Sequence, residues 1–162
     1  MPAIFPRVSI MIPTYCQEDV LLRAIDSALA QDYKNIEVII ADDYSMDNTE
    51  NLVKQRRDSR LVYHRNSSNI GRVANYRNTL YSVATGDWVL NLDGDDYLLD
   101  PSFISAAIES VRSRPNIVMV CGNMLIKRDE VVSTCEFPEE QIMPGVVAVK
   151  KYRESKYQFH HL

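Results

Sequence analysis

The stretch Val8 to Tyr15 reads VSIMIPTY and places an apolar run directly before a small polar cluster. Val8 to Ile12 is rich in β-branched residues and ends at Pro13, a pattern that predicts a buried strand. Residues 19–30 follow with apolar side chains at the spacing of one helix face, so a helix is expected next. A strand joined to an amphipathic helix is the first unit of an α/β fold.

The same alternation continues outward from that unit. Strands are expected at 36–41, 61–64, 88–92 and 117–121, and helices after Asp47, at 73–83 and from Asp100-Pro101 to Pro115. Asp47 with Glu50 three residues later resembles a capping box, and Asp100 with Pro101 supplies a cap and a first helical residue. This order predicts a three-layer α/β/α sandwich with a mostly parallel, Rossmann-like central sheet.

Length, composition and charge fit one domain that does not bind nucleic acid. The 162 residues are expected to form a single domain, 1–162, with its core at 7–127 and a separate region beginning at 128. Beyond residue 127 the pattern weakens into two short strand-like pieces, VVSTCEF and GVVAV, and the basic, aromatic tail KKYRESKYQFHHL. A net charge of −4 gives no footprint for nucleic acid.

Cysteine usage and hydropathy indicate the compartment. Cys16, Cys121 and Cys135 are an odd number without metal-type spacing, which is typical of reduced thiols in the cytoplasm. No signal peptide and no spanning segment is recognisable, so any membrane contact is expected to be peripheral, at the inner face of the membrane. The tail from Lys150 is compatible with a membrane, with an acceptor or with a structural role.

The sharpest polar cluster follows the predicted strand at 88–92. Asp93, Asp95 and Asp96 place three carboxylates within four residues, and their repulsion is relieved by a cation or by water. Oxygen ligands suit Mg2+ or Mn2+, which would keep open positions for substrate phosphates. Gly94 permits a tight turn between the aspartates. A solvated acidic loop remains the alternative reading of this cluster.

Two further polar clusters follow the first and second predicted strands. In open parallel sheets, ligands bind at the carboxyl ends of the strands, so these clusters are expected to join the acidic turn in one site. Asp42 and Asp43 end an apolar strand, and a carboxylate there can accept the imino hydrogen of uracil or thymine. Support of the following turn is the alternative role for this pair. Pro13-Thr14-Tyr15 contributes backbone groups and a hydroxyl.

Taken together, the order of these segments resembles family 2 glycosyltransferases of the GT-A fold. The matching stretches are VSIMIPTY, SALAQDYKNIEVIIADDYSMDNT and NSSNIGRVANYRNTLYSVATGDWVLNLDGDDYLLDPSF, which cover most of residues 7–120. The resemblance implies a nucleotide-sugar site with Asp93 toward ribose and metal and Asp95 on the metal, whereas Asp96 is a weaker candidate. The nucleotide-sugar-binding residues it implies are Pro13, Thr14, Tyr15, Asp42, Asp43, Gly71, Arg72, Asn75 and Asp93.

The activity implied is inverting transfer of a sugar from a UDP- or dTDP-sugar to an acceptor hydroxyl, with Mn2+ or Mg2+ as cofactor. The acceptor, a glycan, a lipid-linked sugar or a protein, stays open, and cell-surface polysaccharide or glycan synthesis is the expected process. The resemblance identifies no catalytic base, and Glu139, Glu140, His160 and His161 are expected to be surface residues. The chain is therefore expected to bind the donor and to transfer sugar poorly. A sugar-nucleotide nucleotidyltransferase and a non-catalytic nucleotide-binding module are the alternatives.

Two positions depart from the family pattern. Cys16 stands where the family often has Asn after the first motif, and Tyr44 stands where Gly often follows the two aspartates. Tyr44 is expected to narrow the base pocket.

Overall fold

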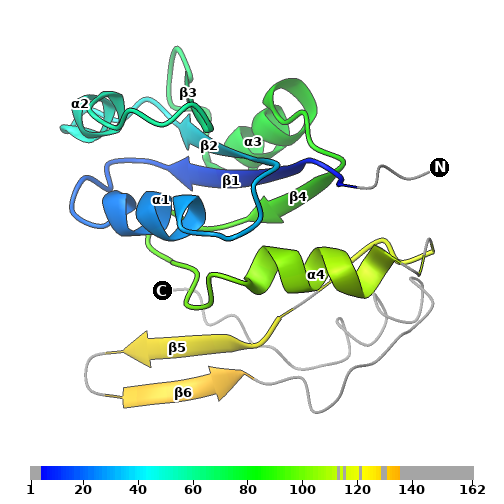
Figure 1. Ribbon diagram of the computed structural model, residues 1–162. Coiled ribbons are helices and arrows are strands. Elements are labelled where there is room, and N and C mark those ends of the chain that lie inside the picture. Colours follow the sequence, from blue (N-terminus) through cyan, green and yellow to red (C-terminus); the bar gives the residue numbers. More distant parts are fainter. Residues whose placement is uncertain (1–4, 113, 115, 121, 129–130, 136–162) are drawn as a thin grey trace. The chain divides into compact units, whose positions relative to one another are not determined.

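The computed structural model describes residues 5–112, 114, 116–120, 122–128 and 131–135 (Figure 1). The chain divides into two compact units, Met1–Glu109 and Ser110–Leu162. The strand-like piece GVVAV and the basic tail lie outside the described residues. So do the four residues expected at the surface, Glu139, Glu140, His160 and His161. All of the predicted site residues lie in the first unit.

A four-stranded parallel sheet forms the centre of the first unit. Its strands are β1 (Val8–Thr14), β2 (Ile36–Asp42), β3 (Leu61–Arg65) and β4 (Trp88–Asn91), in the spatial order β3-β2-β1-β4. In the register, Ile10 lies between Val38 of β2 and Leu90 of β4. Because the strands are parallel, their carboxyl ends meet at one edge, and the predicted parallel α/β sheet is confirmed.

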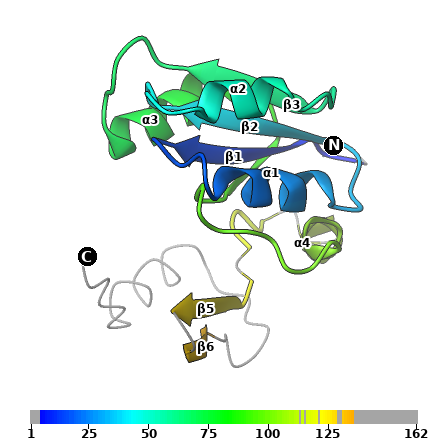
Figure 2. The same cartoon turned by 90° about the vertical axis from the view of Figure 1, so that its left-hand side faces the viewer.

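Helices lie against both faces of this sheet (Figures 1 and 2). They are α1 (Leu21–Leu29), α2 (Thr49–Lys54), α3 (Arg72–Asn78), the wider π-helical turn η1 (Thr79–Val83) and α4 (Phe103–Arg112). Alternate residues of β1 and β2, such as Ile10 and Val38, pack with Leu21, Val53 and Ile104 in one apolar core. On the other face Asn75 of α3 donates a hydrogen bond to the Ala41 carbonyl at 2.8 Å. The three-layer arrangement predicted from the sequence is therefore present.

That second face of the sheet carries a buried polar cluster that ties β4 to the sheet. The carboxylate of Glu37 accepts hydrogen bonds from the hydroxyls of Ser9 and Thr85, at 2.5 and 2.9 Å, and from the Thr85 backbone N–H. The Arg7 guanidinium lies 3.0 Å from the same carboxylate. Burial alone would raise the pKa of Glu37, but these hydrogen bonds and the charge of Arg7 hold it below its usual range.

Two helix starts differ from the sequence prediction. The helix α2 begins at Thr49, and Asp47 does not cap it as the first member of a capping box, since its carboxylate accepts from the backbone of both Thr49 and Glu18. The partner residue Glu50 instead forms an ion pair with Lys54. Asp47 therefore joins α2 to the loop before α1, a long-range contact that the local pattern could not reveal.

At α4 the Asp100 carboxylate accepts hydrogen bonds from the backbone and hydroxyl of Ser102, and the helix starts at Phe103. The Pro101 carbonyl accepts from the Asp32 backbone N–H at 2.9 Å. Asp100 and Pro101 thus form a turn that is joined to the end of α1, and the expected start of the helix at this pair was wrong.

The expected strand at 117–121 is also wrong over its described residues, because 117–120 belong to no strand. An apolar run forms a strand only where a neighbouring strand pairs with it, which the pattern by itself cannot supply. In the second unit the described strands are β5 (Met124–Arg128) and β6 (Val131–Cys135), an antiparallel pair. Sequence reasoning missed β5, and it anticipated β6 as the piece VVSTCEF.

The described part of the chain contains no helix with the length and hydrophobicity that crossing a bilayer requires.

Candidate functional site at the carboxyl edge of the sheet

A cavity of about 320 Å3 lies in the first unit, lined by residues that follow β1, β2 and β4 and by α3. This volume is in the range of small-molecule and cofactor sites. The residues that line it are Pro13, Thr14, Tyr15, Gln17, Asp43, Asn69, Gly71, Arg72, Asn75, Tyr76, Asp93, Gly94 and Asp95. The structure thus brings together all of the predicted site residues except Asp42 and the weaker candidate Asp96.

Asp43 is the best-connected side chain of the cavity. Its Oδ1 accepts hydrogen bonds from the Asn66 amide and the Ile70 backbone N–H, and its Oδ2 accepts from the Gly71 N–H, all at 2.9 Å. Its own backbone N–H donates to the Thr14 carbonyl. With only 3% of its surface exposed, the carboxylate is fixed in one orientation and retains one acceptor position on Oδ2.

Asn75 and Gly71 hold the loop beside Asp43. The buried Asn75 amide donates to the Ala41 carbonyl and accepts from the Asn66 amide, so α3 is bonded to the end of β2. Gly71 precedes α3 with φ of 86°, a conformation that side-chain-bearing residues rarely adopt. Its N–H can therefore point at Asp43, and a substitution at this position would strain the contact.

Asp42 lies behind the cavity and does not line it. It is fully buried, its Oδ1 accepts from the Ser45 backbone N–H, and its Oδ2 accepts from the Tyr63 hydroxyl. Burial, together with that hydrogen bond, raises the pKa of Tyr63 well above its usual value. Arg65 lies 3.4 Å from the same carboxylate. Asp42 is thus placed to support the turn that carries Asp43.

Tyr44 also lies outside the lining of the cavity. Its ring stacks on the Arg65 guanidinium, with 4.6 Å between the guanidinium carbon and the ring centroid. Its φ of 69° is unusual for a residue other than glycine. The residue that replaces the expected glycine therefore adopts the backbone conformation typical of a glycine.

The Asp93 carboxylate at the end of β4 is held by two residues of α3. The Tyr76 hydroxyl donates to its Oδ1 in a short hydrogen bond, and the Arg72 guanidinium lies 3.3 Å from its Oδ2. Asn91 donates in turn to the Tyr76 oxygen at 3.2 Å. Burial and the neighbouring Asp93 raise the pKa of Tyr76, so its hydroxyl remains a donor at neutral pH.

Asp95 and Asp96 follow on the exposed side of the turn. The Asp95 carbonyl accepts from Arg23, whose guanidinium also covers the Tyr97 ring at 4.4 Å. Asp96 is exposed as a residue, yet desolvation of its carboxyl group and the charges of Asp95 and Asp93 raise its pKa above the usual range of an aspartate. The turn thus has an excess of negative charge that its own cations do not neutralise.

The donor set of this turn fits a hard divalent cation held jointly with a ligand. Its oxygen donors, the carboxylates of Asp93 and Asp95, are of the type that Mg2+ and Mn2+ bind. Within the part of the chain that the structure describes, no three acidic, histidine or cysteine side chains converge to hold an ion by themselves. In phosphate-binding sites such ions are coordinated by one or two protein carboxylates, and phosphate oxygens and water fill the other coordination positions.

Four side chains of this region were not predicted from the sequence. Gln17, Asn69 and Tyr76 line the cavity, and Asn66 binds Asp43 from behind. Tyr76 follows Asn75 on α3, and no role was assigned to it from the sequence. Asn66 and Asn69 both occur in the quoted stretch NSSN, so a count of amide side chains beside the glycine could have indicated them.

Comparison with known proteins gives one consistent result. The model of the family described as glycosyl transferase family 2 matches residues 9–134. An Escherichia coli protein named UDP-Glc:alpha-D-GlcNAc-diphosphoundecaprenol beta-1,3-glucosyltransferase WfaP is 35% identical over 78% of this chain and 49% of its own length. A Campylobacter jejuni protein named GalNAc(5)-diNAcBac-PP-undecaprenol beta-1,3-glucosyltransferase is 33% identical over 76% of this chain and 40% of its own length. The chain thus spans about half or less of these curated relatives.

Solved structures agree with this match. Residues 1–349 of S. aureus TarS in complex with UDP-GlcNAc superpose with a TM-score of 0.62 and 28% identity, over 67% of this chain and 32% of that chain. The mannosyltransferase PcManGT from Pyrobaculum calidifontis, in complex with GDP-Man and Mn2+, has a TM-score of 0.64 and 25% identity, over 78% of this chain and 37% of its own.

Proposed function

The chain belongs to glycosyl transferase family 2, and on that premise we propose that it takes part in inverting sugar transfer from a UDP- or dTDP-sugar to an acceptor hydroxyl. In this proposal, residues 1–162 form the nucleotide-sugar-binding domain of the GT-A fold, and the acceptor-side region starts near residue 128. The observation that carries the proposal is the cavity in which Thr14, Asp43 and Asp95 lie together. These side chains follow three different strands and meet only because the sheet is parallel.

Asp43 reads the base in this proposal. Two backbone N–H groups and Asn66 fix the carboxylate, and the remaining acceptor position on Oδ2 is the one that an imino hydrogen would occupy. Uracil and thymine carry such a hydrogen at N3, whereas the cytosine ring does not. Support for a uridine nucleotide also comes from relatives named for UDP-Glc and from the UDP-GlcNAc complex of TarS.

The Asp93–Asp95 turn binds the diphosphate of the donor through a divalent cation. When bound, Mn2+ or Mg2+ supplies Lewis-acid stabilisation of the charge that develops on the leaving diphosphate. Asp93 and Asp95 would hold that ion, and the Mn2+ complex of PcManGT supports a metal at such a site. Arg72 is available from α3 to pair with phosphate oxygens, because its 3.3 Å contact with Asp93 is exposed and therefore weak.

A base within hydrogen-bond reach must take the proton of the acceptor hydroxyl. We assign this role to no described residue. Two relatives are named for sugars linked to diphosphoundecaprenol or undecaprenol, and this supports a lipid-linked sugar as the acceptor and polysaccharide synthesis at the inner face of the membrane as the process. A glycan or protein acceptor is the alternative that an acceptor screen would detect.

Nucleotide binding with and without metal tests the proposal. UDP or dTDP with Mn2+ should raise the thermal midpoint of the chain more than GDP or CDP does, because a ligand of the native state stabilises it by mass action. Asp95→Ala should remove the Mn2+-dependent part of the UDP effect. Asp19→Ala, an exposed carboxylate before α1, should leave it unchanged.

The same binding measurements, together with an assay of the released products, separate the two alternatives. A non-catalytic module would bind UDP with no dependence on Mn2+ or on Asp95. A sugar-nucleotide nucleotidyltransferase would release diphosphate from a nucleoside triphosphate and a sugar phosphate, whereas the proposed activity consumes the nucleotide-sugar and releases the nucleoside diphosphate. Equal stabilisation by all four nucleotides would refute the assignment of Asp43.

A further inference from the structure

The outer face of α3 and η1 exposes an unusual amount of apolar surface. Val73 and Tyr81 are 73% and 75% exposed, and Ile70 and Leu80 are exposed as well. Val73, Arg77, Leu80 and Tyr81 recur three to four residues apart along α3 and η1, a spacing typical of one helix side. Ile70 precedes α3 and lines the same pocket as Val73 and Arg77. We call these five residues the α3 face. The opposite side of the same segment carries the buried residues Asn75 and Thr79.

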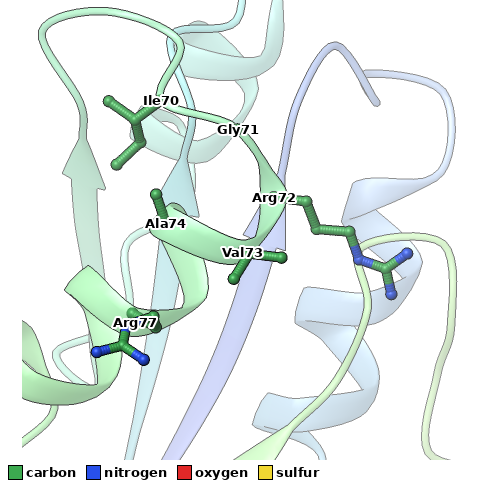
Figure 3. Close-up of a pocket in the computed structure, with 6 residues that line it drawn as sticks. All are labelled: Ile70, Gly71, Arg72, Val73, Ala74 and Arg77. Atoms are coloured by element: carbon green, nitrogen blue, oxygen red, sulfur yellow. The ribbon is translucent and has the colours of Figure 1, made fainter.

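This face is hollowed next to the nucleotide cavity. A shallow pocket of about 620 Å3 is lined by Ile70, Gly71, Arg72, Val73, Ala74 and Arg77 (Figure 3). Figure 3 shows Arg72 directed away from Ile70, Ala74 and Arg77. Arg72 also lines the nucleotide cavity. The two pockets share Gly71 and Arg72, so a molecule on the α3 face would lie beside the bound donor.

The charge of this segment is as distinctive as its exposure. Each of α1, α2 and α4 contains both an acidic and a basic residue, whereas α3 and η1 carry Arg72 and Arg77 and no acid. In fact no Asp or Glu occurs from residue 59 to residue 86, although the whole chain has a net charge of −4. Arg77 covers the Tyr81 ring at 5.8 Å and forms no ion pair among the described residues.

We propose that the α3 face docks on the surface of a membrane that contains anionic lipids. A helix side with a Tyr ring, aliphatic side chains and an arginine, and with no carboxylate, has the character of a helix that lies in the headgroup region. Tyr81 and Val73 enter the interface, and Arg77 pairs with lipid phosphate. Docking here brings the donor cavity to the membrane plane, where a lipid-linked acceptor would be found, and this last step rests on the proposed function.

Sedimentation with vesicles tests the proposal on the full chain. The chain should bind vesicles of phosphatidylglycerol and phosphatidylcholine at low salt and bind phosphatidylcholine alone much more weakly. Arg77→Gln should lower the partition coefficient about fivefold, the equivalent of the ~1 kcal/mol that one basic residue contributes near an anionic surface. The double variant Val73→Ser with Tyr81→Ser should lose most of the remaining binding.

Matched variants elsewhere serve as controls. Arg57→Gln removes an exposed arginine that follows α2, and Met46→Ser removes a side chain that is as exposed as Val73, so both should bind like the native chain. None of the substituted side chains lines the nucleotide cavity. Thermal stabilisation of each variant by UDP, measured without vesicles, therefore tests the proposed function separately from membrane binding. Equal binding to both kinds of vesicle, or equal losses in the controls, would overturn the proposal. A dimer that the double variant converts to a monomer would show instead that a second copy covers this face.

Discussion

Replacement of Asp43 by Asn tests the centre of the site with a change of one atom. The carboxylate accepts three N–H donors in a position where 3% of its surface is exposed. Asparagine keeps one acceptor oxygen and turns the other into a donor. If the amide oxygen takes the place of Oδ1, its NH2 group faces the Gly71 N–H, and that donor keeps only its 3.1 Å hydrogen bond to the Asn69 Oδ1.

The hydrogen bond that is lost joins the Gly71 N–H to a charged carboxylate and is worth about 1.5–3 kcal/mol, so Asp43→Asn should lower the free energy of unfolding by this amount. The effect on nucleotides follows from the same atom. The NH2 group would meet the N3–H of uracil, and loss of a hydrogen bond to a charged group is worth about 1.5–3 kcal/mol, or roughly ten- to 150-fold in UDP affinity. Cytosine has an acceptor at N3, so CDP should lose less and the preference for UDP over CDP should narrow or reverse.

Urea denaturation measures the first effect, and isothermal titration of UDP and CDP measures the second. Asp19→Asn, at an exposed position, is the matched control and should change neither. If stability falls as expected while the preference between UDP and CDP stays as it was, another residue reads the base. An unchanged free energy of unfolding would refute the three hydrogen bonds themselves.

Three further predictions concern the residues around the site. Tyr76→Phe removes the hydroxyl that orients Asp93. In titrations of UDP it should weaken binding in the presence of Mn2+ several-fold and change binding without metal little. The control Tyr81→Phe, at an exposed position, should change neither affinity. Tyr44→Gly should be more stable than Tyr44→Ala by about 1–2 kcal/mol in urea denaturation, since both lose the contact with Arg65 but only glycine relieves a φ of 69°; equal stabilities would exclude strain at this position. Glu37→Gln should cost about 1–3 kcal/mol at neutral pH, because a hydrogen-bonded buried carboxylate is lost. The folded-state pKa of Glu37 lies below its ordinary value of 4.5, so the stabilisation from this carboxylate is present above that value and is lost as the pH falls through the folded pKa. The difference in the free energy of unfolding between the native chain and Glu37→Gln should therefore shrink as the pH falls in urea denaturation, and a constant difference would contradict this.

Sequence reasoning located β1, β2 and β4 because each contains an apolar run with a polar cluster at or just after its end. The runs at 8–12, 36–41 and 88–92 are parts of β1, β2 and β4, with differences of one or two residues at the ends. The parallel order then brought Thr14, Asp43 and Asp93 to one edge, which is a consequence of topology and needs no knowledge of side-chain contacts. This is why the location of the candidate site could be predicted.

The contacts within the site could not be predicted in the same way, because they join residues far apart in the chain. Nothing local distinguishes Asp42 from Asp43, yet one is enclosed by Tyr63 and Ser45 while the other lines the cavity. Tyr76 of α3 reaches Asp93 across 17 positions of sequence, a contact that no local pattern indicates. The same limitation explains the error at Asp47, whose carboxylate binds the Glu18 backbone as well as the local turn.

Gly94 shows how a correct expectation can rest on the wrong cause. A tight turn between the aspartates was expected to need the conformational freedom of glycine, but Gly94 does not have a positive φ. Position 94 has no space for a side chain, because a Cβ there would overlap the Gln17 Oε1 and would lie 3.2 Å from the Pro13 carbonyl oxygen. The acidic turn approaches β1 closely, and that approach requires the absence of a side chain.

A double-mutant cycle separates the two causes. Gly94→Ala should displace the end of Gln17, break its hydrogen bond with the Thr14 hydroxyl and cost about 1–3 kcal/mol in urea denaturation, the usual effect of overpacking. In a Gln17→Ala background the obstructing oxygen is gone and the Pro13 carbonyl needs to yield only slightly, so the same substitution should cost much less. A coupling energy of more than about 0.5 kcal/mol between positions in contact would support close approach. Strictly additive costs would mean that Gln17 is not what obstructs a side chain at Gly94, and the steric account would then be wrong.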